Sequence, residues 1–344
     1  MTTRILGLLG TLYILGSAVW LIAGGFVRND SETELLNVAC DPTRELWKDL
    51  NERFVEDYER NTGIKLSIRM SHGGSASQAR AIIDGLEADV ATLGLWSDTS
   101  ALHQRGLVQD GWVERLPHRS LPYYSTIVFV VRKGNPKGVH DWDDLVTKDV
   151  QIITPNPKTS GNGKLSFLAA WGAKFRQTRD EEQARAFLKA IYRRVPILDT
   201  GARGATDTFS RKRIGDVHLT WENEAALEVH EAKGELEVVY PKSSIRAEPP
   251  VVVVDRYALA KGTKAAADAY MNFLYTPAAQ DAIASHSYRP STLDGWARHR
   301  GKFPAIELFN IEDATEAKLN WDQANERFFT EGGEFDRLYS PPTR

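Results

Sequence analysis

The 344-residue chain has little of several things that often reveal a function. It carries a single cysteine, Cys40, which excludes an intrachain disulfide and leaves folding to the hydrophobic core. Its formal net charge of -3 at pH 7 gives no overall attraction to nucleic acid or to acidic lipid, so we expect neither as a partner. If the protein binds an anion, local hydrogen-bond donors must hold it.

The patterns of common catalytic and metal sites are also missing. No Cys/His cluster has the spacing of metal ligands. The turn His72-Gly73-Gly74 is similar to the oxyanion turn of α/β-hydrolases, but the chain has no G-x-S-x-G nucleophile elbow. Gly161-Asn162-Gly163-Lys164 departs from a P-loop, because Leu165 stands where Ser or Thr would bind magnesium. We therefore expect no metal, no cofactor and no enzymatic activity; a secreted hydrolase or sulfatase-like enzyme is the alternative that a turnover assay would reveal.

One long apolar run is present, between Arg4 and Arg28. Its roughly 23 residues would span the ~30 Å hydrocarbon core of a bilayer as a helix. Because no clean cleavage signal follows, residues 1–28 predict either a signal peptide or an uncleaved N-terminal membrane anchor. Either one exports the rest of the chain, with membrane contact only through this segment.

After this segment, short apolar strands alternate with amphipathic helices. Strands are predicted at 35–39, 65–70 and 89–95, and the pattern restarts near residue 126, with a further strand at 195–198. This alternation predicts an α/β fold whose parallel sheets are covered by helices on both faces.

The length fits two doubly wound α/β lobes around a ligand cleft. The stretch 249–254, two prolines and four valines, predicts a return of the chain from the second lobe to the first. We therefore expect residues 35–122 plus 250–310 to form lobe 1 and residues 123–249 to form lobe 2. Residues 311–344 predict a C-terminal helical tail packed on the lobes, with Trp321, Phe328 and Phe329 as anchors.

Three turns rich in small residues, at 71–76, 158–163 and 200–206, each precede a helical pattern. The first turn of a helix has unpaired backbone N–H groups and the positive end of the helix dipole, which favours an oxyanion. In open α/β sheets such turns meet at the carboxyl ends of the strands. Any one of these turns alone is more often a plain strand-to-helix connection, so their convergence is the informative prediction.

Side chains near these turns refine the prediction. The hydroxyls of Ser75 and Ser160 and the indole N–H of Trp221 would make a pocket of donors only. Such a pocket suits sulfate, which carries no proton, whereas hydrogen phosphate needs an acceptor for its O–H group. A carboxylate facing the ligand, from Asp41 or Asp207, would reverse that preference. Trp221 at a strand end is also compatible with packing, and Asp41 with capping the helix that begins at Pro42.

Several long motifs resemble one known family, the sulfate-binding proteins of bacterial ABC sulfate/thiosulfate permeases. The resemblance covers nearly all of residues 36–340. The motifs that carry it include CDPTRE (40–45), SHGGSASQARAIIDGLEADVATL (71–93), ITPNPKTSGNG (153–163), LDTGARGATDTF (198–209) and GDVHLTWENEA (215–225).

The resemblance implies a type II periplasmic-binding-protein fold that holds sulfate, or thiosulfate, between its lobes and delivers it to an inner-membrane ABC permease. We expect a periplasmic monomer. The ligand contacts carried over from the family are Ser75, Ser160, Gly161, Asn162, Ala202 and Trp221, supported by Asp41, Arg203, Gly74 and Gly163. Asp41 and Arg203 are expected to pair with each other.

Two positions depart from the family pattern. Cys40 stands where an aromatic residue commonly precedes the Asp-Pro pair, and Asn162 stands where Gly is frequent. The alternatives are a binding protein for another tetrahedral oxyanion, phosphate or molybdate, and a membrane-tethered anion sensor.

Overall fold

The computed structural model describes residues 32–339. The predicted signal peptide or anchor at 1–28 lies outside the described residues. Among residues 32–339, no helix has the length and apolar composition of a membrane span.

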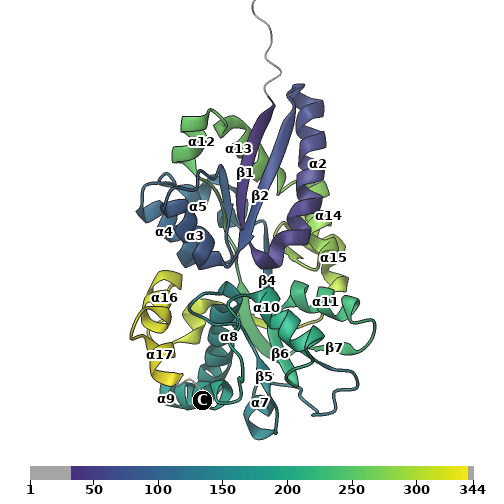
Figure 1. Ribbon diagram of the computed structural model, residues 1–344, viewed down its shortest axis with the longest axis vertical. Coiled ribbons are helices and arrows are strands. Elements are labelled where there is room, and N and C mark those ends of the chain that lie inside the picture. Colours follow the sequence, from purple (N-terminus) through teal and green to yellow (C-terminus); the bar gives the residue numbers. More distant parts are fainter. Residues whose placement is uncertain (1–31, 340–344) are drawn as a thin grey trace, which may run out of the picture.

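Two sheets, each with its own helices, are stacked along the long axis of the molecule (Figure 1). The first sheet has the order β2-β1-β3-β9, in which β1 is parallel to β2 and β3, and β9 is antiparallel to β3. Its strands are β1 (Thr33–Cys40), β2 (Leu66–Gly73), β3 (Val90–Thr92) and β9 (Val251–Val253).

Helices cover the first sheet from both the early and the late part of the chain (Figure 1). The longest, α2 (Arg44–Thr62), buries Leu46, Trp47, Leu50 and Phe54 at helical spacing. The others are α3 (Ser75–Ile83), α4 (Trp96–Gln104), α5 (Trp112–Arg115), α6 (Pro117–Ser120), α12 (Asp255–Lys261), α13 (Lys264–Phe273), α14 (Pro277–Ser285) and α15 (Leu293–His299). Short 3-10 turns lie at η1 (Asp41–Thr43) and η3 (Arg300–Lys302).

The second sheet is built around one long strand, β4 (Tyr123–Arg132). Its order is β11-β8-β4-β6-β5, with β7 and β10 also paired to β4. The remaining strands are β5 (Ile152–Ile153), β6 (Val217–Trp221), β7 (Leu236–Val239), β8 (Ser243–Ala247), β10 (Arg289–Pro290) and β11 (Glu307–Phe309). Its helical elements are α7 (Asp144–Thr147), α8 (Gly161–Thr178), α9 (Glu181–Tyr192), α10 (Ala202–Thr206), the π-helix η2 (Asp207–Arg211), α11 (Glu222–Glu231), η4 (Ile311–Ala314), α16 (Trp321–Phe329) and α17 (Glu334–Leu338).

Three details differ from the sequence prediction. The sheets are mixed, because β4 runs antiparallel to β6, β7, β8 and β10, and only β5–β6 and β8–β11 are parallel there. Residues 195–198 form no strand. β11 pairs with β8, so residues 307–309 lie in the second sheet and not with the first, as the predicted boundary at 310 required. The chain returns along the edge of β8 before the tail begins.

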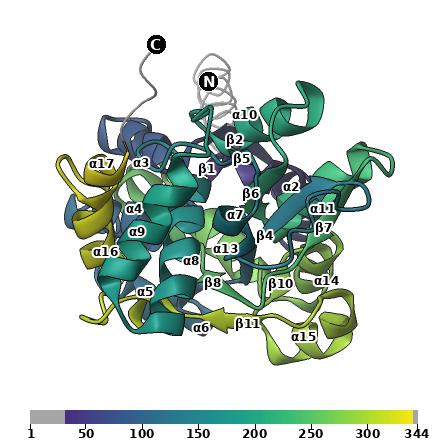
Figure 2. The same cartoon turned by 90° about the horizontal axis from the view of Figure 1, so that it is seen from below.

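The C-terminal segment packs on α8 and α9 of the second lobe (Figure 2). Phe328 and Phe329 are buried, and the ring centroid of Phe328 lies 4.9 Å from that of Trp171. The segment also fixes the turn before α8, because the Lys158 ammonium donates to the carbonyls of Phe329 and Thr330 at 3.1 and 2.9 Å. The same ammonium group of Lys158 also forms an ion pair with Asp336 of α17 at 2.7 Å.

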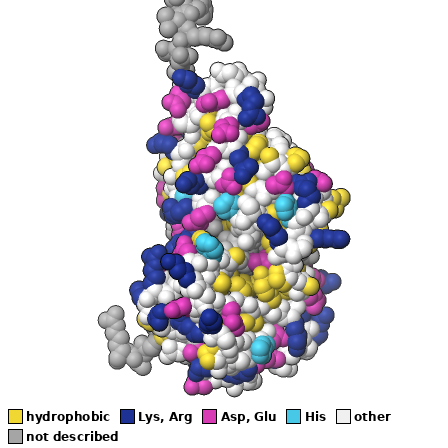
Figure 3. Space-filling view, turned by 90° about the vertical axis from the view of Figure 1, so that its right-hand side faces the viewer, with side chains coloured by type: hydrophobic (Ala, Val, Ile, Leu, Met, Phe, Trp, Pro, Cys, Tyr) yellow, Lys and Arg dark blue, Asp and Glu magenta, His cyan; other side chains and the backbone are white. Residues whose placement is uncertain are grey.

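The surface carries charges of both signs. On the face drawn in Figure 3, acidic and basic side chains are interspersed over the upper lobe. This mixture agrees with the small net charge of the chain. Because such a surface does not attract anions as a whole, selectivity for an anion must come from individual hydrogen-bond donors inside a site.

Candidate functional site

The three small-residue turns converge on one small cavity between the lobes. The space in it that is open to the centre of a water molecule is about 10 Å³, close to the minimum for one water, so any ligand held there must be small. The residues that line it are Cys40, Asp41, Pro42, Gly73, Gly74, Ser75 and Gly94 from the first lobe and Ser160, Gly161, Asn162, Ala202 and Trp221 from the second. All six predicted contact residues are thus brought together, with Asp41 and Gly74 of the supporting set.

Ser75 begins α3 at the end of the first turn and is 1% exposed. Its Oγ accepts a hydrogen bond from the N–H of Gly94 at 2.9 Å. Because that bond uses a lone pair of the hydroxyl, the Ser75 hydrogen remains free to donate. Burial and this fixed acceptor role hold the hydroxyl at the cavity wall.

Ser160 has the same arrangement at the start of α8. It is the N-cap residue, and its Oγ accepts from the N–H of Gly163 at 3.3 Å, which again leaves its own hydrogen for another acceptor. The first helical N–H groups, at Gly161 and Asn162, have no acceptor within the helix. Two free main-chain donors and the positive end of an 18-residue helix therefore face the cavity.

The side chain of Asn162 is hydrogen-bonded away from the cavity. The amide Nδ2 donates to Thr220 Oγ1 at 3.4 Å, and Oδ1 accepts from Ser166 Oγ at 3.4 Å. The residue has helical backbone geometry inside α8. Substitution of Asn for a frequent Gly therefore adds packing behind the cavity without removing the N–H at its wall.

Trp221 supplies the most informative donor. It is the last residue of β6, pairs with Ile127 of β4 and is 1% exposed. Its indole Nε1 is buried and has no hydrogen-bond partner among residues 32–339. Buried N–H groups are normally satisfied, so an unpaired donor at the wall of a cavity indicates a ligand acceptor. Ala202, the first residue of α10, lies in the same wall.

Glycine is required at two positions by close packing. A β-carbon at Gly163 would lie 2.5 Å from the carbonyl oxygen of Pro155, so Gly163 lets α8 start against the preceding loop although it does not line the cavity. A β-carbon at Gly74 would lie 2.7 Å from the carbonyl oxygen of Thr159 in the other lobe. The lobes therefore meet main chain to main chain beside the cavity.

The predicted pair between Asp41 and Arg203 is wrong. Asp41 pairs with Arg44, one turn along the chain, at 3.1 Å. Arg203 instead reaches α2, where its Nη2 lies 2.5 Å from Glu45 Oε2, and its Nε lies 3.4 Å from Glu224 Oε2. The Arg203–Glu45 contact joins the two lobes, as does the contact of Lys164 with Asp98 at 3.8 Å.

These contacts set the charge around the cavity. Asp41 is a lining carboxylate, but Arg44 neutralises it, and Asp207 pairs with Arg211 at 3.2 Å outside the cavity. Burial raises the pKa of Glu224 to about 8, although the guanidinium of Arg203 acts in the opposite direction. The donors of the second lobe thus face no unpaired carboxylate that would favour a protonated anion.

Sequence reasoning missed several residues of the site. Pro42 and Gly73 lie inside the quoted motifs but received no contact role, Cys40 was noted only as a departure from the family pattern, and Gly94 stands two residues after the buried strand β3. Glu45 and Glu224 were missed as partners of Arg203. These contacts depend on where α10 lies relative to α2, which carries Glu45, and to α11, which carries Glu224, and no local pattern encodes that.

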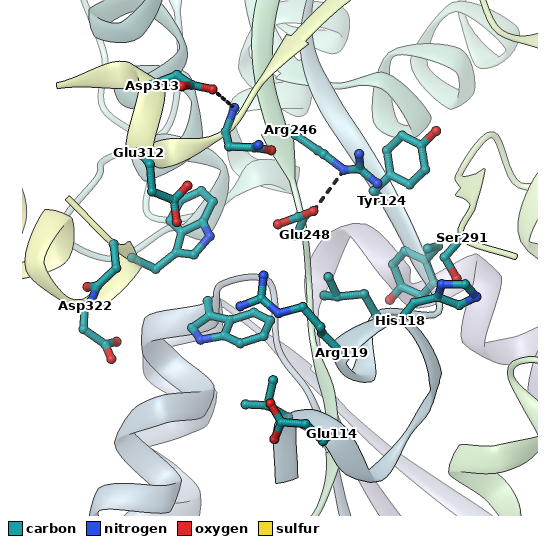
Figure 4. A pocket seen from close by; sticks show the side chains of 17 residues that line it. Glu114, His118, Arg119, Tyr124, Arg246, Glu248, Ser291, Glu312, Asp313 and Asp322 are labelled. Atoms are coloured by element: carbon teal, nitrogen blue, oxygen red, sulfur yellow. Dashed lines mark hydrogen bonds and ion pairs between the residues drawn. The ribbon is translucent and has the colours of Figure 1, made fainter. Parts of the chain in front are cut away.

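A larger hollow of about 890 Å³ lies elsewhere between the lobes and is a poor oxyanion site (Figure 4). Arg246 stacks over Tyr124 at 4.1 Å and pairs with Glu248 at 3.0 Å, which occupies its charge. Five carboxylates line this hollow and would repel a dianion: Glu114, Glu248, Glu312, Asp313 and Asp322.

Fold and site together define a solute-binding protein with a small cavity between two lobes. A model of the bacterial extracellular solute-binding protein family matches residues 36–289, and the chain belongs to that family. Within it, the sulfate-binding protein of Escherichia coli (strain K12) is 46% identical over 309 residues, 89% of this chain and 93% of the relative. The thiosulfate-binding protein of the same strain is 45% identical over 311 residues, 89% of this chain and 91% of the relative.

A solved structure agrees with these relatives. The sulfate-binding protein SubI from Mycobacterium tuberculosis H37Rv matches with a TM-score of 0.78 and 30% sequence identity, covering 87% of this chain and 100% of that one. The predicted two-lobe type II fold and the predicted membership among sulfate- and thiosulfate-binding proteins are both confirmed.

Proposed function

We propose that this protein captures sulfate or thiosulfate in the cavity between its lobes and delivers the anion to an ABC permease. It makes and breaks no covalent bond, in keeping with relatives that are named as binding proteins. The observation that carries the proposal is the Trp221 indole N–H, buried at the cavity without a partner among the described residues.

Lobe closure is the proposed mechanism. In an open form, the donors of α3 lie on one lobe, whereas those of α8, α10 and Trp221 lie on the other. An anion that bridges them stabilises the closed form, in which Arg203 also reaches Glu45. The permease then recognises the closed pair of lobes.

The hydrogen-bond inventory favours a fully ionised dianion over hydrogen phosphate. Ser75 and Ser160 each accept a main-chain hydrogen bond and so present hydrogens to the ligand. Asp41 is the carboxylate of the lining, and the charge of Arg44 beside its Oδ1 offsets part of its repulsion toward a dianion. Phosphate and molybdate, which share the tetrahedral shape, remain the second candidate ligands.

We also propose that the protein is exported, acts as a periplasmic monomer, and touches the membrane only through residues 1–28. The apolar composition of that segment supports export. A membrane-tethered sensor would share the anion site but would function without transport, so loss of sulfate uptake on deletion of the gene separates the two roles.

Isothermal titration calorimetry of residues 32–344 with sulfate, thiosulfate, phosphate and molybdate tests the ligand. We expect saturable one-site binding of sulfate or thiosulfate at micromolar or lower concentrations and much weaker binding of phosphate. Binding of phosphate or molybdate in the absence of any heat from sulfate and thiosulfate would overturn the proposal.

A further inference from the structure

One part of the cavity wall differs from the rest because it presents no hydrogen-bond donor. We call it the donor-free patch and define it as Cys40, Pro42 and Gly94. Proline has no N–H group, and the N–H of Gly94 is already donated to Ser75 Oγ. The remaining group is the thiol of Cys40, which is the single cysteine of the chain and is 3% exposed.

The thiol hydrogen is directed away from the cavity. Thr43 Oγ1 gives its hydrogen to the carbonyl oxygen of Cys40 at 2.8 Å, so it meets the thiol as an acceptor, with Cys40 Sγ at 3.9 Å. That hydrogen is therefore not available to an anion in the cavity. Burial raises the pKa of the Cys40 thiol to about 12, so the sulfur is neutral and does not repel an anion by charge.

The patch lies beside the donors of α3. A β-carbon built on Gly94 would lie 3.5 Å from Cys40 Sγ and 3.6 Å from the β-carbon of Ser75. The thiol and Ser75 therefore flank the same glycine, and an anion held by the Ser75 hydroxyl must turn another of its atoms toward the sulfur. Trp221, whose unpaired indole N–H indicates a ligand, lines the same cavity.

The two ligands of the proposed function differ at one atom. Each oxygen of sulfate is a strong acceptor, and an oxygen placed against the donor-free patch loses a hydrogen bond that water would have supplied. The terminal sulfur of thiosulfate is larger, more polarisable and a weaker acceptor, so contact with a thiol and a proline ring suits it better. The patch thus discriminates by leaving an acceptor unsatisfied.

We propose that the donor-free patch receives the terminal sulfur of thiosulfate, and that Cys40 is the residue that sets the preference of this protein for thiosulfate over sulfate. This assignment rests on the proposed function, since it names which of the two anions the same site favours. Ser75, Ser160 and Trp221 hold the other three oxygens of sulfate, or the three oxygens of thiosulfate.

Calorimetric titration of wild type, C40S and C40A with sulfate and thiosulfate tests the assignment. Wild type is expected to bind thiosulfate at least as tightly as sulfate. Serine replaces the polarisable sulfur by a smaller oxygen, so the thiosulfate-to-sulfate affinity ratio should fall about tenfold in C40S, which is about 1.4 kcal/mol. In C40A the ratio should also fall, because the contact with sulfur is lost.

Titration with selenate shows whether the polarisability of the terminal sulfur or the size of the anion determines the preference. Selenate is larger than sulfate but, like sulfate, has four oxygens. The selenate-to-sulfate ratio should be the same in wild type and C40S. A crystal of the thiosulfate complex should place the anomalous signal of the terminal sulfur next to Cys40 Sγ. Thermal unfolding of both variants checks that they are folded.

These titrations distinguish failure of the Cys40 assignment from failure of the proposed function. If wild type binds neither sulfate nor thiosulfate, the proposed function itself is wrong. If both anions bind but their ratio is unchanged in C40S and C40A, or shifts equally for selenate, the role of Cys40 is overturned. A terminal sulfur found against Trp221 would overturn it as well.

Discussion

Gly74 of the first lobe faces the carbonyl of Thr159 in the second lobe so closely that a β-carbon on Gly74 would lie 2.7 Å from the Thr159 oxygen. The backbone of Gly74 has φ -60° and ψ 135°, which any residue can adopt. Glycine is therefore needed at this position for the approach of the lobes and not for a special backbone conformation.

G74A should weaken anion binding by more than tenfold while leaving the unfolding temperature of the ligand-free protein nearly unchanged. The added methyl group obstructs the closed form, because its nearest neighbour is main chain and cannot turn aside. Titration with sulfate measures the loss. G301A is the control, since a β-carbon at Gly301 would meet no atom within 4 Å. Equal affinities in G74A and wild type would mean that the lobes bind the anion without this contact.

W221F should lower affinity for sulfate by about tenfold to a hundredfold, because it removes one hydrogen bond to a charged acceptor. The matched control is W171F. Trp171 is also fully buried with an unpaired indole Nε1, but it packs against Phe328 and does not line the cavity. A similar loss of affinity in both variants would point to altered packing, and no loss in W221F would remove the indole from the site.

Anion binding should protect Cys40 from alkylation. The thiol is buried in the closed form and its pKa is raised, so we expect iodoacetamide to react with Cys40 only after the lobes open. Mass spectrometry reports one site, as Cys40 is the sole cysteine. Saturating sulfate should slow the reaction several-fold, whereas urea-unfolded protein should react at one rate with and without sulfate. If the alkylation rate of the folded protein is the same with and without sulfate, the anion binds elsewhere.

The free energy of unfolding should depend on pH through Glu224. Its pKa is about 8 in the folded protein against an ordinary value of 4.5, so the folded state holds this proton more tightly. Between those values the folded state binds more protons than the unfolded state, and stability contributed by Glu224 falls as pH rises. Urea unfolding of ligand-free protein at pH 5, 6, 7 and 8 measures the slope.

E224Q should flatten that slope, because glutamine does not titrate. E231Q, which removes an exposed carboxylate from the same helix, is the control. If E224Q retains the wild-type slope over this range, another group is responsible for it.

Much of the site could be predicted from the sequence because its donors obey local rules. Ser75, Ser160 and Ala202 each lie where a small-residue turn passes into a helix, and parallel strands bring such turns to one edge. Trp221 follows from its place at the end of a buried strand, together with the family resemblance. These positions depend on neighbours a few residues away.

What could not be predicted depends on contacts between distant segments. Arg203 and Glu45 are 158 positions apart and meet only because α10 packs over the start of α2. The direction of β4 against β6 and β8 was missed for a similar reason, since an apolar run fits a parallel or an antiparallel partner equally well. The donor-free patch follows from which hydrogen bonds are already made, and residue types alone do not reveal that.

The anchoring of Lys158 by the last helices has a consequence for biogenesis. Lys158 stands two residues before Ser160, and its ammonium is held by Phe329, Thr330 and Asp336. Synthesis and export both proceed from the N-terminus, so these partners emerge long after the turn that contains Lys158. A nascent chain that has already formed both sheets still lacks the contacts that hold Lys158 in the second small-residue turn. The turn that contains Ser160 therefore reaches its final position only after residues 329–336 have followed.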